Sequence, residues 1–239
     1  MIIYINPRKI GVVLGSIISF LLFMSLASQL YKYLLFDGHD RYLIDLFFLD
    51  GENNIPAWYS SVSLLLCSML TGLHYQLFKM VDDMPYKKHW LGLSVIFLLL
   101  ASDEMLQFHE QINTPLRELI DTSGFFYYSW IVPALIALVG FVLTYYRFLM
   151  SLPNKTRNWF IVSGFVYVAG CVGIEMIGGN FYQQFGGNNL TYSLITHLEE
   201  TMEMVGIVIF IVSLLSYFQS KYPNVTVSSV PSQSKAGTG

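Results

Sequence analysis

The sequence carries little charge. Only 12% of its 239 residues are Asp, Glu, Lys or Arg, whereas a soluble domain normally carries about a quarter. Long apolar runs recur from one end of the chain to the other, and 54% of the residues are hydrophobic. This composition excludes an ordinary soluble domain and predicts an all-α, polytopic membrane protein.

Other scarce features exclude further classes. The two cysteines, Cys67 and Cys171, lie within apolar runs, where we expect small buried side chains rather than a disulfide or a metal pair. Lys and Arg form no patch large enough for nucleic acid, so no nucleic-acid partner is expected. Because the chain also lacks a phosphate-binding glycine loop and a nucleophile elbow, no common enzyme motif assigns its function.

The apolar runs predict six transmembrane helices in a bundle, each long enough for a hydrocarbon core of about 30 Å. These spans are placed near residues 10–35, 57–79, 89–110, 127–150, 158–179 and 192–218. Together they form one predicted membrane domain over residues 1–219. The polar remainder, residues 220–239, contains Ser, Pro and Gly and is expected to be a disordered cytoplasmic tail.

The first apolar run has two interpretations. Arg8 and Lys9 precede it and Ser25-Leu26-Ala27 resembles a cleavage site, which are features of a signal peptide. The run is about 17 residues long, longer than most signal-peptide cores, which favours a retained helix. Both interpretations leave the orientation of the other spans unchanged.

The distribution of lysine and arginine predicts the orientation of the bundle. Three of these residues fall on one side of the predicted membrane: Lys32, Arg41 and Arg117. Ten fall on the other: Arg8, Lys9, Lys79, Lys87, Lys88, Arg147, Lys155, Arg157, Lys221 and Lys235. The positive-inside rule then predicts that both termini are cytoplasmic. We expect a bacterial inner membrane as the location and membrane lipid as the partner, and both a monomer and a homo-oligomer stay open.

Acidic residues lie inside the predicted spans with no lysine or arginine beside them. They are Asp103, Glu104 and Glu110 in the third span, Glu175 in the fifth, and Glu199, Glu200 and Glu203 in the sixth. At the centre of a span each acid costs about 2.5–3.5 kcal/mol on insertion scales. Such a set requires compensation by protons, water or cations.

Three of these acids are predicted to lie at one depth. Counting 1.5 Å per residue from the cytoplasmic ends of their helices places Asp103, Glu175 and Glu203 about 20–23 Å from the inner surface. His109 and His197 lie a turn or two further out. This agreement predicts one outward-facing polar site between the third, fifth and sixth spans.

Carboxylates and imidazoles together predict a metal site. Zn, Fe and Mn take mixed oxygen and nitrogen ligands, and helical bundles hold dinuclear carboxylate sites on facing helices. The Glu-x-x-His element of such sites occurs here only in reverse, as His197-x-x-Glu200. The predicted ligands of a divalent metal ion are Asp103, Glu104, His109, Glu110, Glu175, His197, Glu200 and Glu203.

A metal ion at this depth suits an enzyme that acts on a lipid-like substrate. It would activate water for hydrolysis, with a spare glutamate as general base, or activate oxygen in an oxidoreductase if it were iron. The sequence assigns neither catalytic nor substrate-binding residues. Two alternatives stay open: a proton- or cation-coupled transporter, for which intramembrane acids are typical, and a non-catalytic structural or sensing membrane protein.

Three segments together resemble a group of uncharacterised bacterial multipass membrane proteins. The segments are FFLDGENNIPAWYS, ASDEMLQFHE and HLEETMEMVG, and the resemblance extends over most of the chain. It implies a membrane-embedded fold and brings no established activity.

Overall fold

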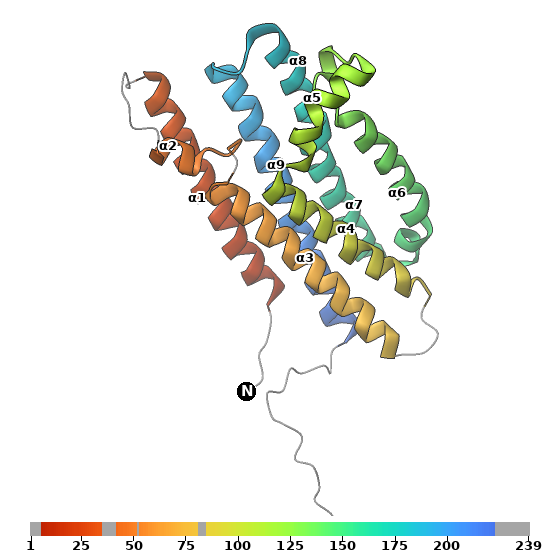
Figure 1. Ribbon diagram of the computed structural model, residues 1–239. Helices are drawn as coiled ribbons and strands as arrows, with labels where there is room; N and C mark the ends of the chain where they lie inside the picture. The colour runs from red at the N-terminus through yellow and green to blue at the C-terminus, as the bar shows by residue number, and fades with distance from the viewer. Residues whose placement is uncertain (1–5, 35–41, 52, 81–84, 223–239) are drawn as a thin grey trace, which may run out of the picture.

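The computed structural model of the chain describes residues 6–34, 42–51, 53–80 and 85–222. Within these ranges the regular structure is helical, with no β-strand (Figure 1). Six helical segments of the described chain are long and apolar enough to cross a membrane. The prediction of an all-helical chain with six such segments is therefore confirmed for these residues.

The helices follow one another with short connections. The first five are α1 (Pro7–Leu34), α2 (Tyr42–Phe47), α3 (Ile55–Met80), α4 (Lys87–Leu106) and α5 (Phe108–Ile120). After the short turn η1 (Gly124–Phe126) come α6 (Ile131–Ser151), α7 (Asn154–Val168), η2 (Ala169–Ile174), α8 (Glu175–Phe185) and α9 (Leu190–Lys221). Of the predicted tail, residues 223–239 lie outside the described residues.

The helix α9 is the centre of the bundle. It packs against α1, α3 and α7, and it is buried over much of its length. The start of α1 and the end of α9 lie at the same end of the bundle (Figure 1). Gly206 allows the closest approach, because a Cβ there would lie 2.8 Å from the backbone nitrogen of Tyr167. Small residues at such contacts let the backbones of membrane helices pack closely.

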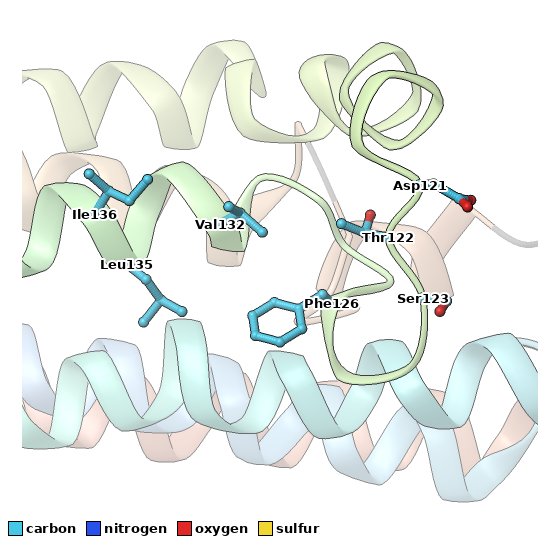
Figure 2. Close-up of a pocket in the computed structure, with 7 residues that line it drawn as sticks. All are labelled: Asp121, Thr122, Ser123, Phe126, Val132, Leu135 and Ile136. Carbon is cyan, nitrogen blue, oxygen red and sulfur yellow. The ribbon is translucent and has the colours of Figure 1, made fainter.

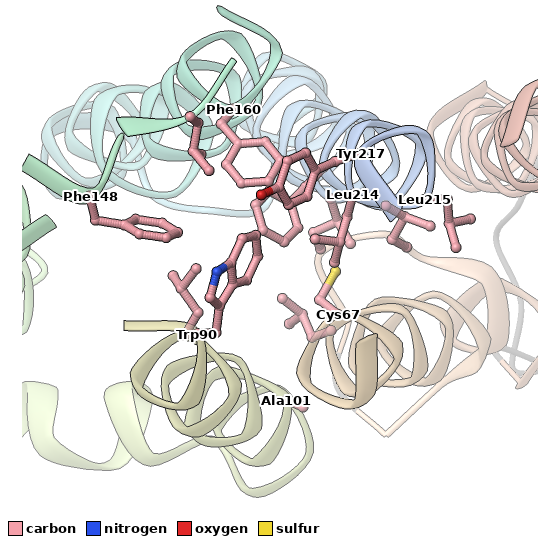
Figure 3. Packing of buried hydrophobic residues seen from close by; sticks show 14 residues of the cluster. Cys67, Trp90, Ala101, Phe148, Phe160, Leu214, Leu215 and Tyr217 are labelled. Atoms are coloured by element: carbon pink, nitrogen blue, oxygen red, sulfur yellow. The ribbon is translucent and has the colours of Figure 1, made fainter. Parts of the chain in front are cut away.

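An aromatic and aliphatic cluster fills the bundle towards the end of α9 (Figure 3). The ring of Trp90 stacks on Tyr217 with centroids 5.7 Å apart, and it meets Phe148 edge-on at 5.1 Å. His74 stacks against both rings, with centroids 4.6 Å from Trp90 and 5.6 Å from Tyr217. The free thiol of Cys67 is buried in the same cluster. This half of the bundle is therefore closely packed and largely apolar.

Two helical segments are irregular beside the predicted acids. Gln107 adopts a left-handed conformation with φ of 57°, which ends α4 at Leu106 and starts α5 at Phe108. The predicted span 89–110 thus contains a break close to its C-terminal end. Between α7 and α8, the π-helical stretch η2 ends next to Glu175. Such π-helical turns are frequent at functional sites.

The helix α6 stands apart from the rest of the bundle (Figure 1). Its backbone is not packed closely against that of α4. Side chains join the two helices near the end of α6, where the Tyr145 hydroxyl donates to the carbonyl of His89 at 3.2 Å and Phe148 meets Trp90. On its outer side, Ile136 and Leu143 are 71% and 75% exposed, as expected for side chains that face lipid. The space on its inner side is the cavity described next.

Candidate functional site

A cavity of about 910 Å³ lies between α4, α6, α7 and α9. Its lining has two parts, an acidic end and an apolar shaft. The acidic end consists of Asp50, Asp103, Glu104, Glu110, Glu175, Glu199, Glu200 and Glu203 together with His109. Among the described residues, no lysine or arginine lines the cavity. The acidic end therefore has a large excess of acidic over basic side chains.

The structure brings seven of the eight predicted metal ligands to this cavity. They are Asp103, Glu104, His109, Glu110, Glu175, Glu200 and Glu203. The three acids that were predicted at one depth lie close enough for their charges to interact: Asp103, Glu175 and Glu203. Glu199, which the ligand prediction omitted, lines the cavity as well. His197 does not.

Asp103 and His109 form an ionic pair at the acidic end. His109 Nδ1 donates to Asp103 Oδ2 at 2.7 Å, and its backbone N–H donates to Oδ1 at 3.0 Å. The Asp103 carboxylate thus caps the first turn of α5, directly after the break at Gln107. Burial alone would lower the pKa of His109, but the bond to Asp103 and the nearby acids raise it to about 9. His109 is therefore positively charged at pH 7.

Aromatic side chains orient the acids. The indole N–H of Trp130, at the start of α6, donates to Glu175 Oε1 at 2.8 Å. The same indole lies 5.1 Å from the His109 ring, measured between centroids. Tyr167 lies within hydrogen-bonding reach of the Glu203 carboxylate. Hydrogen bonds of this kind fix the direction in which a carboxylate points.

The position of the acidic side chains of α9 depends on the close contact of this helix with η2. A Cβ on Gly170 would lie 2.9 Å from the carbonyl oxygen of Glu199 and 3.1 Å from Cγ of Glu203. Only glycine fits this approach without displacing α9. The position of the α9 acids relative to Glu175, which follows η2 directly, therefore depends on Gly170.

His197 lies on a different face of α9, buried against α1. Its Nδ1–H donates to the carbonyl of Ser193 at 2.5 Å, so Nε2 accepts the hydroxyl of Ser25 at 2.7 Å. Ser25 Oγ in turn accepts the backbone N–H of Leu49 at 3.0 Å. This chain of hydrogen bonds connects α1 and α9 to the segment before Asp50. His197 therefore holds α9 in place beside the cavity without lining the cavity itself.

The remaining part of the cavity is the apolar shaft. Side chains of four helices line it: Leu93 and Phe97 of α4, Phe141 of α6, Phe160 of α7 and Phe210 of α9. Leu93 lies ten residues before Asp103 in α4, so the shaft extends about 15 Å from the acidic end. Phe148 and Phe160 belong both to the shaft and to the cluster of Figure 3, which forms its floor.

A second hollow, of about 510 Å³, lies where the turn after α5 meets α6 (Figure 2). Val132, Leu135 and Phe126 form its apolar side, and Asp121 lies at its far edge. It has a single acid and no histidine among its lining residues. It offers no chemistry comparable with the acidic end.

Comparison with protein families gives a match over residues 14–218 to the domain of unknown function DUF8692. The chain belongs to this family. The DUF8692 match contains every residue of the acidic end and of the shaft. It agrees with the resemblance of the three sequence segments to an uncharacterised family and, like it, names no function. No curated protein and no solved structure matches the chain.

The donor atoms of this DUF8692 chain suit a divalent metal ion, but their arrangement is not that of a finished metal site. Carboxylate and imidazole are ligands of Zn, Fe and Mn. In the part of the chain that the structure describes, no three His, Cys, Asp or Glu side chains are grouped so as to hold an ion. Asp103 and His109 are moreover bonded to each other. Metal binding would need rotation of the glutamate side chains.

Four aromatic residues that line the cavity beside the acidic end of the DUF8692 chain were not predicted from the sequence. They are Tyr128, Trp130, Tyr167 and Tyr192. Asp50 of the acidic end, like Glu199, was not among the predicted ligands. A signal for two of the aromatic residues is visible, because Tyr128 and Trp130 come just before the apolar run of α6, on the side of the acids. Tyr128 and Tyr192 bond to each other through their hydroxyls at 2.8 Å, although 64 residues separate them. No local sequence pattern predicts the hydrogen bond between Tyr128 and Tyr192.

Proposed function

We propose that this protein is a metal-dependent membrane enzyme that takes a lipid-like substrate into its cavity. The observation that carries this proposal is the union of an acidic end and an apolar shaft in one cavity of about 910 Å³. A lipid-like molecule has the same two parts, a polar head and an apolar chain. Its head would lie among the acids and its chain would follow the shaft towards the aromatic cluster.

The proposed topology has six membrane-spanning helices with both termini in the cytoplasm of a bacterial cell. The common location of the start of α1 and the end of α9 supports an even number of crossings (Figure 1). Ten of the 13 lysines and arginines fall on that side, as the positive-inside rule expects for a cytoplasmic face. The acidic end then lies towards the outer face of the inner membrane.

Glu175, Glu199 and Glu203 would hold the ion, with Asp103 as a further oxygen ligand. Rotations about the single bonds of the glutamate side chains would bring their oxygens together. When bound, a divalent ion supplies Lewis-acid activation of water or of the substrate head. Trp130 orients Glu175 through the 2.8 Å bond to its carboxylate.

The ligand set is tested by the metal content of protein purified without chelator. We expect stoichiometric divalent metal in the wild type and its loss in Glu203→Gln and Asp103→Asn. Glu118→Gln is the matched control, because Glu118 is exposed on α5 and does not line the cavity. Metal-free wild-type protein, or metal retained in Glu203→Gln, would contradict the proposal.

A proton- or cation-coupled transporter is the second candidate function. The break at Gln107 and the π-helical stretch η2 favour it, because interrupted helices form the binding sites of many transporters. The apolar shaft opposes it, because an ion route needs polar groups beyond the acids. Cation flux into proteoliposomes that is pH-dependent and absent in Glu203→Gln would support transport, and flux equal to that of protein-free liposomes would exclude it.

A further inference from the structure

We propose that the substrate of this cavity is a single-chain amphiphile with a cationic, ammonium-bearing head. This inference rests on the proposed function in taking the cavity as the substrate site, and it names the class of substrate. The head would lie among the acids next to the aromatic rings, and the one chain would fill the shaft.

The charge of the acidic end selects the sign of the head. Apart from Asp50 and Glu104, six carboxyl groups share the acidic end with one histidine, and no lysine or arginine of the described residues lines the cavity. A single divalent ion compensates the charge of at most two of these carboxyl groups. A phosphate head would add charge of the same sign at short range, whereas an ammonium head removes the repulsion between the acids. The cavity therefore discriminates against anionic lipids.

Aromatic rings at the same end point independently to an ammonium group. Trp130, Tyr128 and Tyr192 line the cavity beside the acids. Faces of tryptophan and tyrosine attract alkylammonium ions, most strongly where water is excluded. Acids and aromatic rings together are the usual surroundings of a bound amine, whereas carboxylates repel the charge of a phosphate.

The shaft limits the number and length of the chains. Its length of about 15 Å matches an extended chain of roughly a dozen carbons. The cavity volume of about 910 Å³ lies within the range of sites that enclose one small molecule. One chain with its head fits this space better than a phospholipid with two chains.

Two glycines allow the shaft to be filled without disturbing its walls. Gly140 of α6 and Gly164 of α7 both line the cavity, and no atom lies within 4 Å of the position of an added Cβ at either residue. Gly164 lies on the same face of its helix as Phe160, Tyr167 and Val168, which also line the cavity. A leucine at either glycine would project into the shaft. Gly15 of α1 has equally open surroundings but lies outside the cavity, so it provides a matched control.

The test is equilibrium binding of radiolabelled dodecylamine to the full chain in zwitterionic nanodiscs, with dodecanol and dodecyl phosphate as competitors. We expect saturable amine binding and at least about tenfold weaker competition by either competitor, the effect of losing one charged contact. Gly164→Leu and Gly140→Leu should abolish amine binding, and Gly15→Leu should leave it unchanged. Glu199→Gln should weaken it about tenfold or more.

Equal competition by dodecyl phosphate, or full amine binding in both shaft variants, would overturn this inference. Two shaft variants on different helices guard against one of them failing to fold, which size-exclusion chromatography detects. Each measurement is made with and without chelator to separate the two proposals. Metal-loaded protein that does not prefer the amine contradicts the substrate class alone. Amine binding by a protein that never takes up metal contradicts the metal-dependent enzyme alone.

Discussion

Replacing Asp103 by asparagine removes the charge that keeps His109 protonated while preserving the shape of the side chain. The wild-type carboxylate contacts His109 twice, through Nδ1 at 2.7 Å and through the backbone N–H at 3.0 Å. These contacts and the neighbouring acids outweigh burial and raise the His109 pKa from 6.5 to about 9. Such a difference corresponds to at most about 3 kcal/mol of differential stabilisation of the charged form. In Asp103→Asn, burial should dominate and the pKa of His109 should fall towards 6.5 or below.

The sign of the pH effect follows from the raised pKa. A histidine that binds its proton more tightly in the folded state stabilises it fully below the unfolded pKa of 6.5, and this stabilisation is lost as the pH rises through about 9. Chelator-treated wild-type protein should therefore lose up to about 3 kcal/mol of unfolding free energy over this window, and Asp103→Asn much less. Histidine NMR titration gives the pKa directly, with Glu118→Gln as control. A wild-type His109 that titrates near 6.5 would refute this reasoning.

Three further substitutions test the supports of the acidic end by chemical unfolding in detergent. Gly170→Ala should lower the free energy of unfolding by about 1–3 kcal/mol, because its Cβ overpacks the contact with α9. Gly173→Ala is the control and should change the stability little, because its Cβ meets nothing within 4 Å. Equal effects of the two substitutions would contradict this account. Trp130→Phe should lower the free energy of unfolding by about 1–2 kcal/mol and weaken metal binding, because the hydrogen bond to Glu175 is removed. Unaltered metal binding would show that Trp130 does not orient Glu175 for the ion. Ser25→Ala should lower the free energy of unfolding by about 1–3 kcal/mol, because it leaves His197 Nε2 and the backbone N–H of Leu49 without their hydrogen-bond partner. Unchanged stability would show that these bonds do not hold α1 to α9.

The helices were predictable because lipid leaves the backbone few choices. A chain with scarce charge and long apolar runs must satisfy its own peptide groups within the membrane, and helices do so within each segment. The ends of the helices were less predictable. The break at Gln107 carries no proline or glycine signal. The Asp103 carboxylate, which accepts the backbone N–H of His109 just after the break, becomes visible as its partner only in the structure. The segment from α7 through α8 runs to Phe185, beyond the predicted end at residue 179.

The common cavity of three acids was predictable, whereas the helix face that each residue occupies was not. Residue counts along roughly parallel helices measure depth, which is why Asp103, Glu175 and Glu203 were expected together and line one cavity. The face that a residue presents depends on which helix packs beside it, and sequence alone does not give that neighbour. His197 therefore shares a helix with the α9 acids but bonds to Ser25 of α1. The apolar shaft was also unpredicted, because it arises from the separation of α6 from α4.

The central claim is that the acids of the cavity act together as one cation site. The most direct test is titration of Mn²⁺ into chelator-treated protein, with free Mn²⁺ followed by electron paramagnetic resonance. We predict saturable binding in the wild type and in Glu118→Gln, and binding at least about tenfold weaker in Glu203→Gln. Absence of saturable binding in the wild type, or equal affinity in Glu203→Gln, would contradict the account.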